Sequence, residues 1–232
     1  MRLDKFLKDT GFGSRKEVKI LIKQKRVSVN DTVVSNEGLS INEEKDIVKV
    51  DNIEVKYVRF VYIMLNKPKG VVSATVDNVH TTVLDLIKEY KYLELFPVGR
   101  LDIDTEGLLL ITNDGVLSHN LLSPKKHVDK TYFLNTNEPL TDLDMSTLEN
   151  GVYLDSELTL PAKISQVSEF EYLLTICEGK FHQVKRMIEC VGKKVTYLKR
   201  VSFGPLVLDE ELPLGSYRFL TDEEILKLTK KD

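Results

Sequence analysis

The segment GRLDIDTEGLLLITNDG, residues 99–115, places charged side chains directly before a strongly apolar run. Arg100 and Asp102 follow a glycine and precede GLLLITND, a run typical of a strand buried on both faces. A carboxylate at such a junction can be withdrawn from water while a neighbouring cation keeps it ionised. It can then act as a nucleophile or as a general base. Aspartate is also common in turns because it hydrogen-bonds its own backbone, so the spacing alone is equally compatible with a structural Asp102.

The same segment partly matches a calcium-binding loop. Asp102, Asp104, Glu106 and Gly107 stand at loop positions 1, 3, 5 and 6, but Asn113 occupies position 12, where the pattern needs a bidentate glutamate. The residues after the glycine are apolar and offer few oxygen ligands. We therefore expect no metal at this segment.

Cysteine and histidine add no second catalytic pattern. Cys177 and Cys190 form no CxxC pair and are expected to be ordinary thiols. His182 has no serine or cysteine partner spaced for a catalytic triad. The sequence contains no Walker loop or Rossmann glycine fingerprint, so we expect chemistry without a cofactor.

The net charge of -3 hides two basic segments. Residues 1–30 carry nine basic and three acidic side chains, and residues 180–200 carry seven basic and one acidic, so each segment is +6 and the remainder is -15. A polyanion responds to the local field within a Debye length of about 8–10 Å rather than to the total charge. Two basic surfaces on an acidic body suit a nucleic acid held at two places, although two solvated helix faces would give the same counts.

The elements that position these residues fall into two parts. In the first part we expect a helix over residues 3–10, a second helix opened by a capping box between Ser14 and Glu17, a hairpin turning at residues 30–31, and two short strands within residues 39–56. In the second part we expect strands within 60–74, 107–114, 130–136, 171–179 and 194–204, and helices over 81–90, 181–192 and 221–230. Many strands with few helices between them indicate an α+β fold on a mixed or antiparallel sheet.

The N-terminal part resembles the S4 domain, a small RNA-binding module. The resemblance lies in RLDKFL, SRKEVK and KQKRVSVN within residues 1–31. It implies an S4-like domain over residues 1–58 and a second domain over residues 59–232. The side chains expected to contact RNA in the first domain are Arg2, Lys5, Ser14, Arg15, Lys16, Lys19, Lys23 and Arg26.

The second part resembles the pseudouridine synthases that carry an S4 domain. Besides residues 99–115, the matching segments are MLNKPKG at 64–70, SPKKHVDKTY at 123–132 and EGKFHQVKRM at 178–187. The run HQVKRM following LNKPKG favours the branch that acts on small-subunit (16S) ribosomal RNA. Four motifs in the same order are more specific than any one of them.

This resemblance implies a role for individual residues. Asp102 matches the family's nucleophile, and Tyr132 matches the tyrosine that stacks on the target base. Lys185 matches the basic residue that orients the aspartate, with Arg100 as a second candidate and Arg186 as a neighbouring alternative. Further RNA contacts are expected from Lys180, Arg186 and Arg200.

The sequence therefore predicts a pseudouridine synthase that acts without a cofactor on small-subunit ribosomal RNA, either free or within an assembling ribonucleoprotein. We expect the protein to be cytosolic, since no apolar run is long enough to span a bilayer and the N-terminus lacks the apolar core of a secretory signal. We also expect a monomer. Two alternatives remain at this point: a ribosome-assembly factor that binds RNA without catalysis, and a synthase acting on large-subunit (23S) ribosomal RNA.

Overall fold

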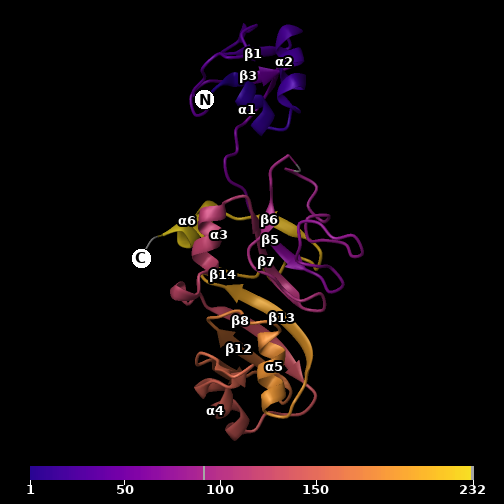
Figure 1. Ribbon diagram of the computed structural model, residues 1–232, viewed down its shortest axis with the longest axis vertical. Helices are drawn as coiled ribbons and strands as arrows, with labels where there is room; N and C mark the ends of the chain where they lie inside the picture. Colours follow the sequence, from indigo (N-terminus) through magenta and orange to yellow (C-terminus); the bar gives the residue numbers. More distant parts are fainter. Residues whose placement is uncertain (91, 231–232) are drawn as a thin grey trace. The chain divides into compact units, whose positions relative to one another are not determined.

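The computed structural model describes residues 1–90 and 92–230. The chain divides into two compact units, drawn in Figure 1. Unit 1 is Met1–Val61 with Lys88–Leu95, and unit 2 is Tyr62–Ile87 with Phe96–Asp232. The domain boundary after residue 58 stays a prediction. None of the helices within the described residues is long and apolar enough to cross a membrane.

Unit 1 places two short helices against a small antiparallel sheet of order β2-β1-β3-β4. The predicted capping box is confirmed, with Ser14 and Glu17 bonded to each other at the start of the second helix. The predicted hairpin turn is also confirmed, and both of its central residues, Asn30 and Asp31, have positive φ angles of 50° and 62°. The elements are α1 (Leu3–Asp9), α2 (Arg15–Lys23), β1 (Val27–Val29), β2 (Thr32–Val33), β3 (Val48–Val50) and β4 (Ile53–Glu54).

Unit 2 is built on a mixed sheet of order β11-β12-β8-β13-β7-β5-β15, with β14 beside β13 and β6 beside β7. In this sheet β13 runs parallel to β7, and the other neighbouring pairs are antiparallel. The α+β prediction is therefore confirmed. The strands are β5 (Tyr62–Lys67), β6 (Phe96–Pro97), β7 (Glu106–Thr112), β8 (Lys130–Thr136), β11 (Lys163–Gln166), β12 (Glu171–Ile176), β13 (Val195–Phe203), β14 (Leu206–Val207) and β15 (Tyr217–Phe219).

The helices of unit 2 cover different parts of this sheet. Leu117 and Leu121 of α3 and Leu228 of α6 pack in one core cluster with Leu108 and Leu110 of β7. Figure 1 shows α3 and α6 near β5 and β7, and α5 near β8 and β13. The remaining elements are α3 (Gly115–Leu122), the 3-10 turn η1 (Pro124–Lys126), α4 (Asp142–Asn150), the hairpin β9 (Tyr153–Leu154) and β10 (Glu157–Leu158), α5 (Gln183–Cys190) and α6 (Asp222–Thr229).

The helix predicted over residues 81–90 is wrong. This segment forms turns: the Thr82 N–H and hydroxyl both donate to Asp85 Oδ2, at 2.7 and 2.9 Å, and Asp85 N–H bonds back to the Thr82 carbonyl. These bonds have the form of a capping box, but the backbone bonds of the segment join residues three apart, as in Ile87 N–H to the Leu84 carbonyl, and Tyr90 has a positive φ of 55°, so no α-helix continues from them. The strands expected within residues 60–74 are only partly present, since the second one is reduced to an isolated bridge between Val72 and Thr82.

The parallel contact between β7 and β13 depends on Gly107. Its φ angle is +102°, and a Cβ atom at this position would lie 2.2 Å from the Arg200 backbone oxygen. Such a distance is far inside van der Waals contact, and the backbone conformation itself favours glycine. Gly107 therefore allows the strand that follows Asp102 to approach β13 closely.

We predict that Gly107→Ala lowers the free energy of unfolding by about 2–4 kcal/mol, because the strands must separate to accept the methyl group. Gly115→Ala is the matched control: Gly115 begins α3, and an added Cβ meets no atom within 4 Å. The control should leave stability unchanged or raise it by up to about 1 kcal/mol. Urea denaturation of both variants measures this, and equal losses would contradict the assigned role of Gly107.

A second prediction concerns Glu224, which caps α6 with Thr221 and accepts two 2.8 Å hydrogen bonds from the Arg218 guanidinium. The Arg218 hydrogen bonds lower the pKa of Glu224 to about 2. Its stabilising effect is thus complete above its ordinary pKa and is lost as the pH falls toward 2. We expect Glu224→Gln to cost about 1–2 kcal/mol at pH 7 and progressively less below pH 4.5 in urea titrations. A difference from wild type that does not change with pH would disprove this linkage.

Candidate active site

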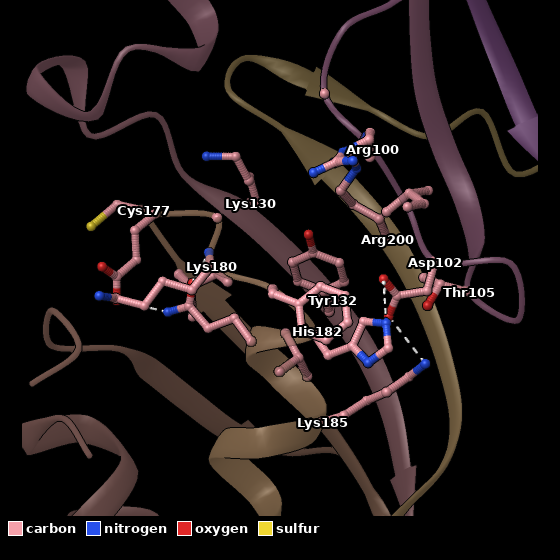
Figure 2. A pocket seen from close by; sticks show the side chains of 18 of the residues that line it. Arg100, Asp102, Thr105, Lys130, Tyr132, Cys177, Lys180, His182, Lys185 and Arg200 are labelled. Carbon is pink, nitrogen blue, oxygen red and sulfur yellow. Dashed lines mark hydrogen bonds and ion pairs between the residues drawn. The ribbon is translucent and has the colours of Figure 1, made fainter. Parts of the chain in front are cut away.

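A cavity of about 560 Å³ opens in unit 2 beside Asp102. Its walls come from residues 99–102 before β7, from Lys130 and Tyr132 of β8, from residues 176–185 between β12 and α5, and from Leu198 and Arg200 of β13. Figure 2 shows these side chains around the cavity. Segments far apart in the sequence therefore form one site, because the sheet places β7, β13 and β8 side by side.

Asp102 is held in an ion pair with Lys185. Lys185 Nζ lies 3.1 Å from Asp102 Oδ2 and 2.6 Å from Asp104 Oδ1, and the Asp102 side chain is 27% exposed. Burial works against the charge on Lys185, but hydrogen bonds to the two carboxylates outweigh it and raise the pKa of the ammonium group. His182 Nε2 lies 3.6 Å from the other Asp102 oxygen. The site thus presents a carboxylate with a permanent cation at its side, open to the cavity.

The backbone that carries Asp102 is fixed by Lys67, a residue that the sequence analysis did not single out. Lys67 is fully buried, and its Nζ donates to the carbonyl oxygens of Asp102 at 3.0 Å and Thr105 at 2.9 Å. Burial lowers the pKa of Lys67 to about 8, although Asp102 attracts the charge. On the other side of the loop, the Ser73 hydroxyl donates to the Leu101 carbonyl and accepts from the Leu101 N–H. The lysine of the MLNKPKG motif therefore holds the loop in place. Its position within that motif was the one sequence signal that could have identified it.

Tyr132 lies on the cavity side of β8 and is 8% exposed. It faces Arg200 on β13 in the strand register. His182 adopts a left-handed backbone conformation just before α5, and its ring stacks on Phe181 with centroids 3.8 Å apart. Figure 2 shows Tyr132 and His182 on the same cavity as Asp102. Aromatic surface is therefore available next to the carboxylate.

The other basic residues expected near Asp102 take different positions. Arg100 is exposed and lines the cavity, whereas the basic side chain that pairs with Asp102 is Lys185. Arg186 pairs with Asp155 at 2.7 Å, so it is directed away from Asp102. Lys180 pairs with Glu157 on the β9–β10 hairpin. Of the basic residues expected to pair with Asp102, Lys185 is the one that contacts it.

Arg200, a residue expected to contact RNA, is buried. It is 2% exposed, its Nε donates to the Leu108 carbonyl at 2.8 Å, and its guanidinium lies 4.9 Å from the centroid of the Phe203 ring. Lys130 Nζ approaches the same ring at 5.6 Å. Any RNA contact of Arg200 must therefore be made from inside the cavity.

In unit 1 the predicted RNA-binding side chains divide into two groups. Lys5, Arg15, Lys16 and Lys23 are exposed and form no ion pair with another described residue. The others already have partners in the protein. They are Arg2 with Asp4, Lys19 with Glu37, Arg26 with Asp51, and Ser14, whose hydroxyl caps α2 through Glu17. The four exposed residues without an ion pair therefore have positive charge available to bind a polyanion.

Within the described residues, no group of three or more histidine, cysteine, aspartate and glutamate side chains could hold a metal ion. In the segment that partly resembled a calcium loop, Asp104 pairs with Lys185 and Glu106 accepts a 2.8 Å hydrogen bond from Tyr197. Cys177 and Cys190 are free thiols.

Comparison with known proteins supports the two resemblances. A family model for RNA pseudouridylate synthase matches residues 61–190, and a model for the S4 domain matches residues 1–48. The chain is 47% identical to an uncharacterized RNA pseudouridine synthase, YtzG, of Bacillus subtilis (strain 168), with 97% of each chain covered. It is 44% identical to the ribosomal small subunit pseudouridine synthase A of Vibrio cholerae serotype O1 (strain ATCC 39315 / El Tor Inaba N16961), over 99% of this chain and 100% of that protein.

A solved structure gives the same result for the fold. The crystal structure of a pseudouridylate synthase, 36% identical in sequence, superposes with a TM-score of 0.70 over 99% of this chain and 100% of the other. The likeness thus extends over both units and all four motifs. Since the family model spans more than half of its length, the chain belongs to the RNA pseudouridylate synthase family and carries an S4 domain at its N-terminal end.

Proposed function

We propose that this protein converts a uridine of small-subunit ribosomal RNA to pseudouridine in the cytosol, with Asp102 as the nucleophile. The observation that carries the proposal is the Asp102–Lys185 ion pair on a cavity that Tyr132 also lines. The relative from Vibrio cholerae, named for the small subunit, matches along its whole length and supports this RNA as the substrate.

The chemistry suits these residues. Isomerisation breaks the glycosidic bond, turns the base and joins its C5 atom to the sugar, without net oxidation or hydrolysis. One carboxylate can support this through a covalent intermediate, and Lys185 orients that carboxylate through their ion pair. A cavity of about 560 Å³ is large enough for one extruded nucleotide.

The uridine must leave its stack before it reaches Asp102. Extrusion costs a few kcal/mol, and stacking on an aromatic side chain with phosphate contacts offsets this cost. Tyr132 provides the aromatic ring inside the cavity, and the exposed Arg100 provides charge at its wall. Lys180 and Arg186 can bind phosphates where RNA displaces Glu157 and Asp155, their present partners.

We predict that Asp102→Asn abolishes pseudouridine formation, with a loss of at least about 10³-fold, while RNA affinity stays near that of wild type. The reaction is measured with a small-subunit ribosomal RNA transcript tritiated at uridine C5, because joining C5 to the sugar releases that hydrogen. Asp104→Asn is the matched control, since it removes the other carboxylate on Lys185 and should lower the rate less than about tenfold. Undiminished modification by Asp102→Asn would exclude Asp102 as the nucleophile. If the wild-type protein modified a large-subunit transcript and not the small-subunit one, the substrate would be large-subunit ribosomal RNA.

We also predict that the triple variant Arg15→Ala, Lys16→Ala, Lys23→Ala binds this RNA about 10- to 100-fold more weakly. The slope of log affinity against log salt should fall by about 2, since each lost phosphate contact removes about 0.7–0.9. Lys49→Ala is the control, because Lys49 already pairs with Asp31. Binding that matches wild type at every ionic strength would remove unit 1 from RNA recognition.

A further inference from the structure

Phe181 is an aromatic side chain at the wall of the cavity, and the roles proposed above do not use it. It is 73% exposed and is one of the residues that line the cavity. A single exposed apolar side chain is common on a protein surface, so exposure alone does not indicate a function. The contacts of Phe181, its support and its neighbours give the reason to assign one.

The Phe181 ring is stacked on the imidazole of His182. The two ring centroids are 3.8 Å apart and the planes differ by 17°, so His182 covers one face of Phe181. Since Phe181 is 73% exposed, its opposite face is open. His182 Nε2 lies 3.6 Å from Asp102 Oδ1, and Figure 2 shows the imidazole beside the carboxylate. The stack therefore begins next to the proposed nucleophile and ends in an open aromatic face.

The buried Gln183 holds the segment that carries Phe181. Its side-chain oxygen accepts a 2.9 Å hydrogen bond from the Lys180 N–H, and its side-chain nitrogen donates to Glu178 Oε1 at 2.7 Å. The Phe181 carbonyl accepts a 3.4 Å hydrogen bond from the Arg186 guanidinium. An aromatic ring on a backbone held in this way loses little conformational freedom when a ligand stacks on it. Phe181 is thus a preorganised stacking surface.

The residues around Phe181 favour an anionic partner that contains flat rings. Residues 180–186 include three basic side chains, Lys180, Lys185 and Arg186, and no acidic one. Proteins bind single-stranded nucleic acid through this combination, since bases stack on the aromatic ring and phosphates pair with the cations. RNA has this chemistry, and the family to which the chain belongs modifies RNA.

We propose that Phe181 stacks on the nucleobase next to the target uridine in the RNA chain. This inference rests on the proposed function. When the uridine is extruded toward Asp102, the neighbouring base loses one of its stacking partners. The neighbouring nucleotide must follow the uridine to the wall of the cavity, where the open face of Phe181 replaces the lost partner. Phe181 is then a positioning residue: it stabilises the extruded form of the RNA and touches none of the reacting atoms.

Substitution of Phe181 in the full-length protein is the first measurement. Single-turnover pseudouridine formation is followed with a fragment of small-subunit ribosomal RNA, at RNA concentrations below saturation. Phe181→Ala should lower the rate about 5- to 100-fold, and Phe181→Leu similarly, because leucine is apolar but has no aromatic face. Phe181→Trp should stay within about threefold of wild type. Phe170→Ala is the matched control and should not change the rate, since Phe170 is exposed but lies between β11 and β12, outside the cavity wall.

RNA that lacks the neighbouring base gives the second measurement. Two further RNA fragments each carry an abasic nucleotide, one on the 5′ side and one on the 3′ side of the modified uridine. With one of them, Phe181→Ala and wild type should differ by less than about twofold, because the base that Phe181 contacts is already absent. With the other fragment the full loss should remain. The abasic position that removes the difference identifies which neighbour stacks on Phe181.

The outcomes separate this inference from the proposed function. If Phe181→Ala matches wild type on the intact fragment, or loses the same factor on all three RNAs, the stacking role is overturned while the proposed function stands. Thermal unfolding identifies a variant that fails to fold, in which case Phe181→Leu takes the place of Phe181→Ala with the same expectations. A wild-type protein that forms no pseudouridine would instead overturn the proposed function together with the inference.

Discussion

The ion pair between Asp102 and Lys185 is the interaction on which the rest of the site depends. It joins the loop before β7 to the first turns of α5, two segments about eighty residues apart in the chain. The pair places a cation next to the carboxylate at the edge of a cavity, where an isolated charge would be costly. Every other feature of the site either holds one of these two partners in place or shapes the space that a nucleotide would occupy.

The sheet of unit 2 holds the Asp102 loop through close backbone contacts. Gly107 brings β7 onto β13, so the strand that follows Asp102 reaches the strand that carries Arg200. The buried Lys67 ammonium group donates hydrogen bonds to the carbonyl oxygens of Asp102 and Thr105 in the loop before β7. These contacts involve backbone atoms, so they fix where the carboxylate stands and leave its oxygens available for chemistry. The resulting cavity wall is rich in cations, as an RNA substrate requires, although the net charge of the chain is -3.

Much of the architecture could be predicted because local signals and tertiary packing agreed. The apolar run of β7 is buried throughout, and the capping boxes of α2 and α6 mark their first turns. The helix expected over residues 81–90 is absent although Thr82 and Asp85 form the bonds of a helix cap, because the backbone bonds there join residues three apart and Tyr90 has a positive φ angle, and an apolar pattern reports neither. The sequence of HQVKRM does not show which of its two basic residues pairs with Asp102. The direction of α5 decides this, because it turns Lys185 toward Asp102 and Arg186 toward Asp155. The burial of Arg200 likewise follows from the sheet and not from its charge.

Mapping pseudouridine at base resolution in ribosomal RNA from cells tests the central claim most directly. Cells lacking this protein would be compared with cells that regain either the wild-type chain or the form with asparagine at position 102. One small-subunit site should lose its pseudouridine on deletion, regain it with the wild-type chain and stay unmodified with the asparagine form at equal protein abundance. Restoration of that site by the asparagine form, or an unchanged map after deletion, would contradict the claim.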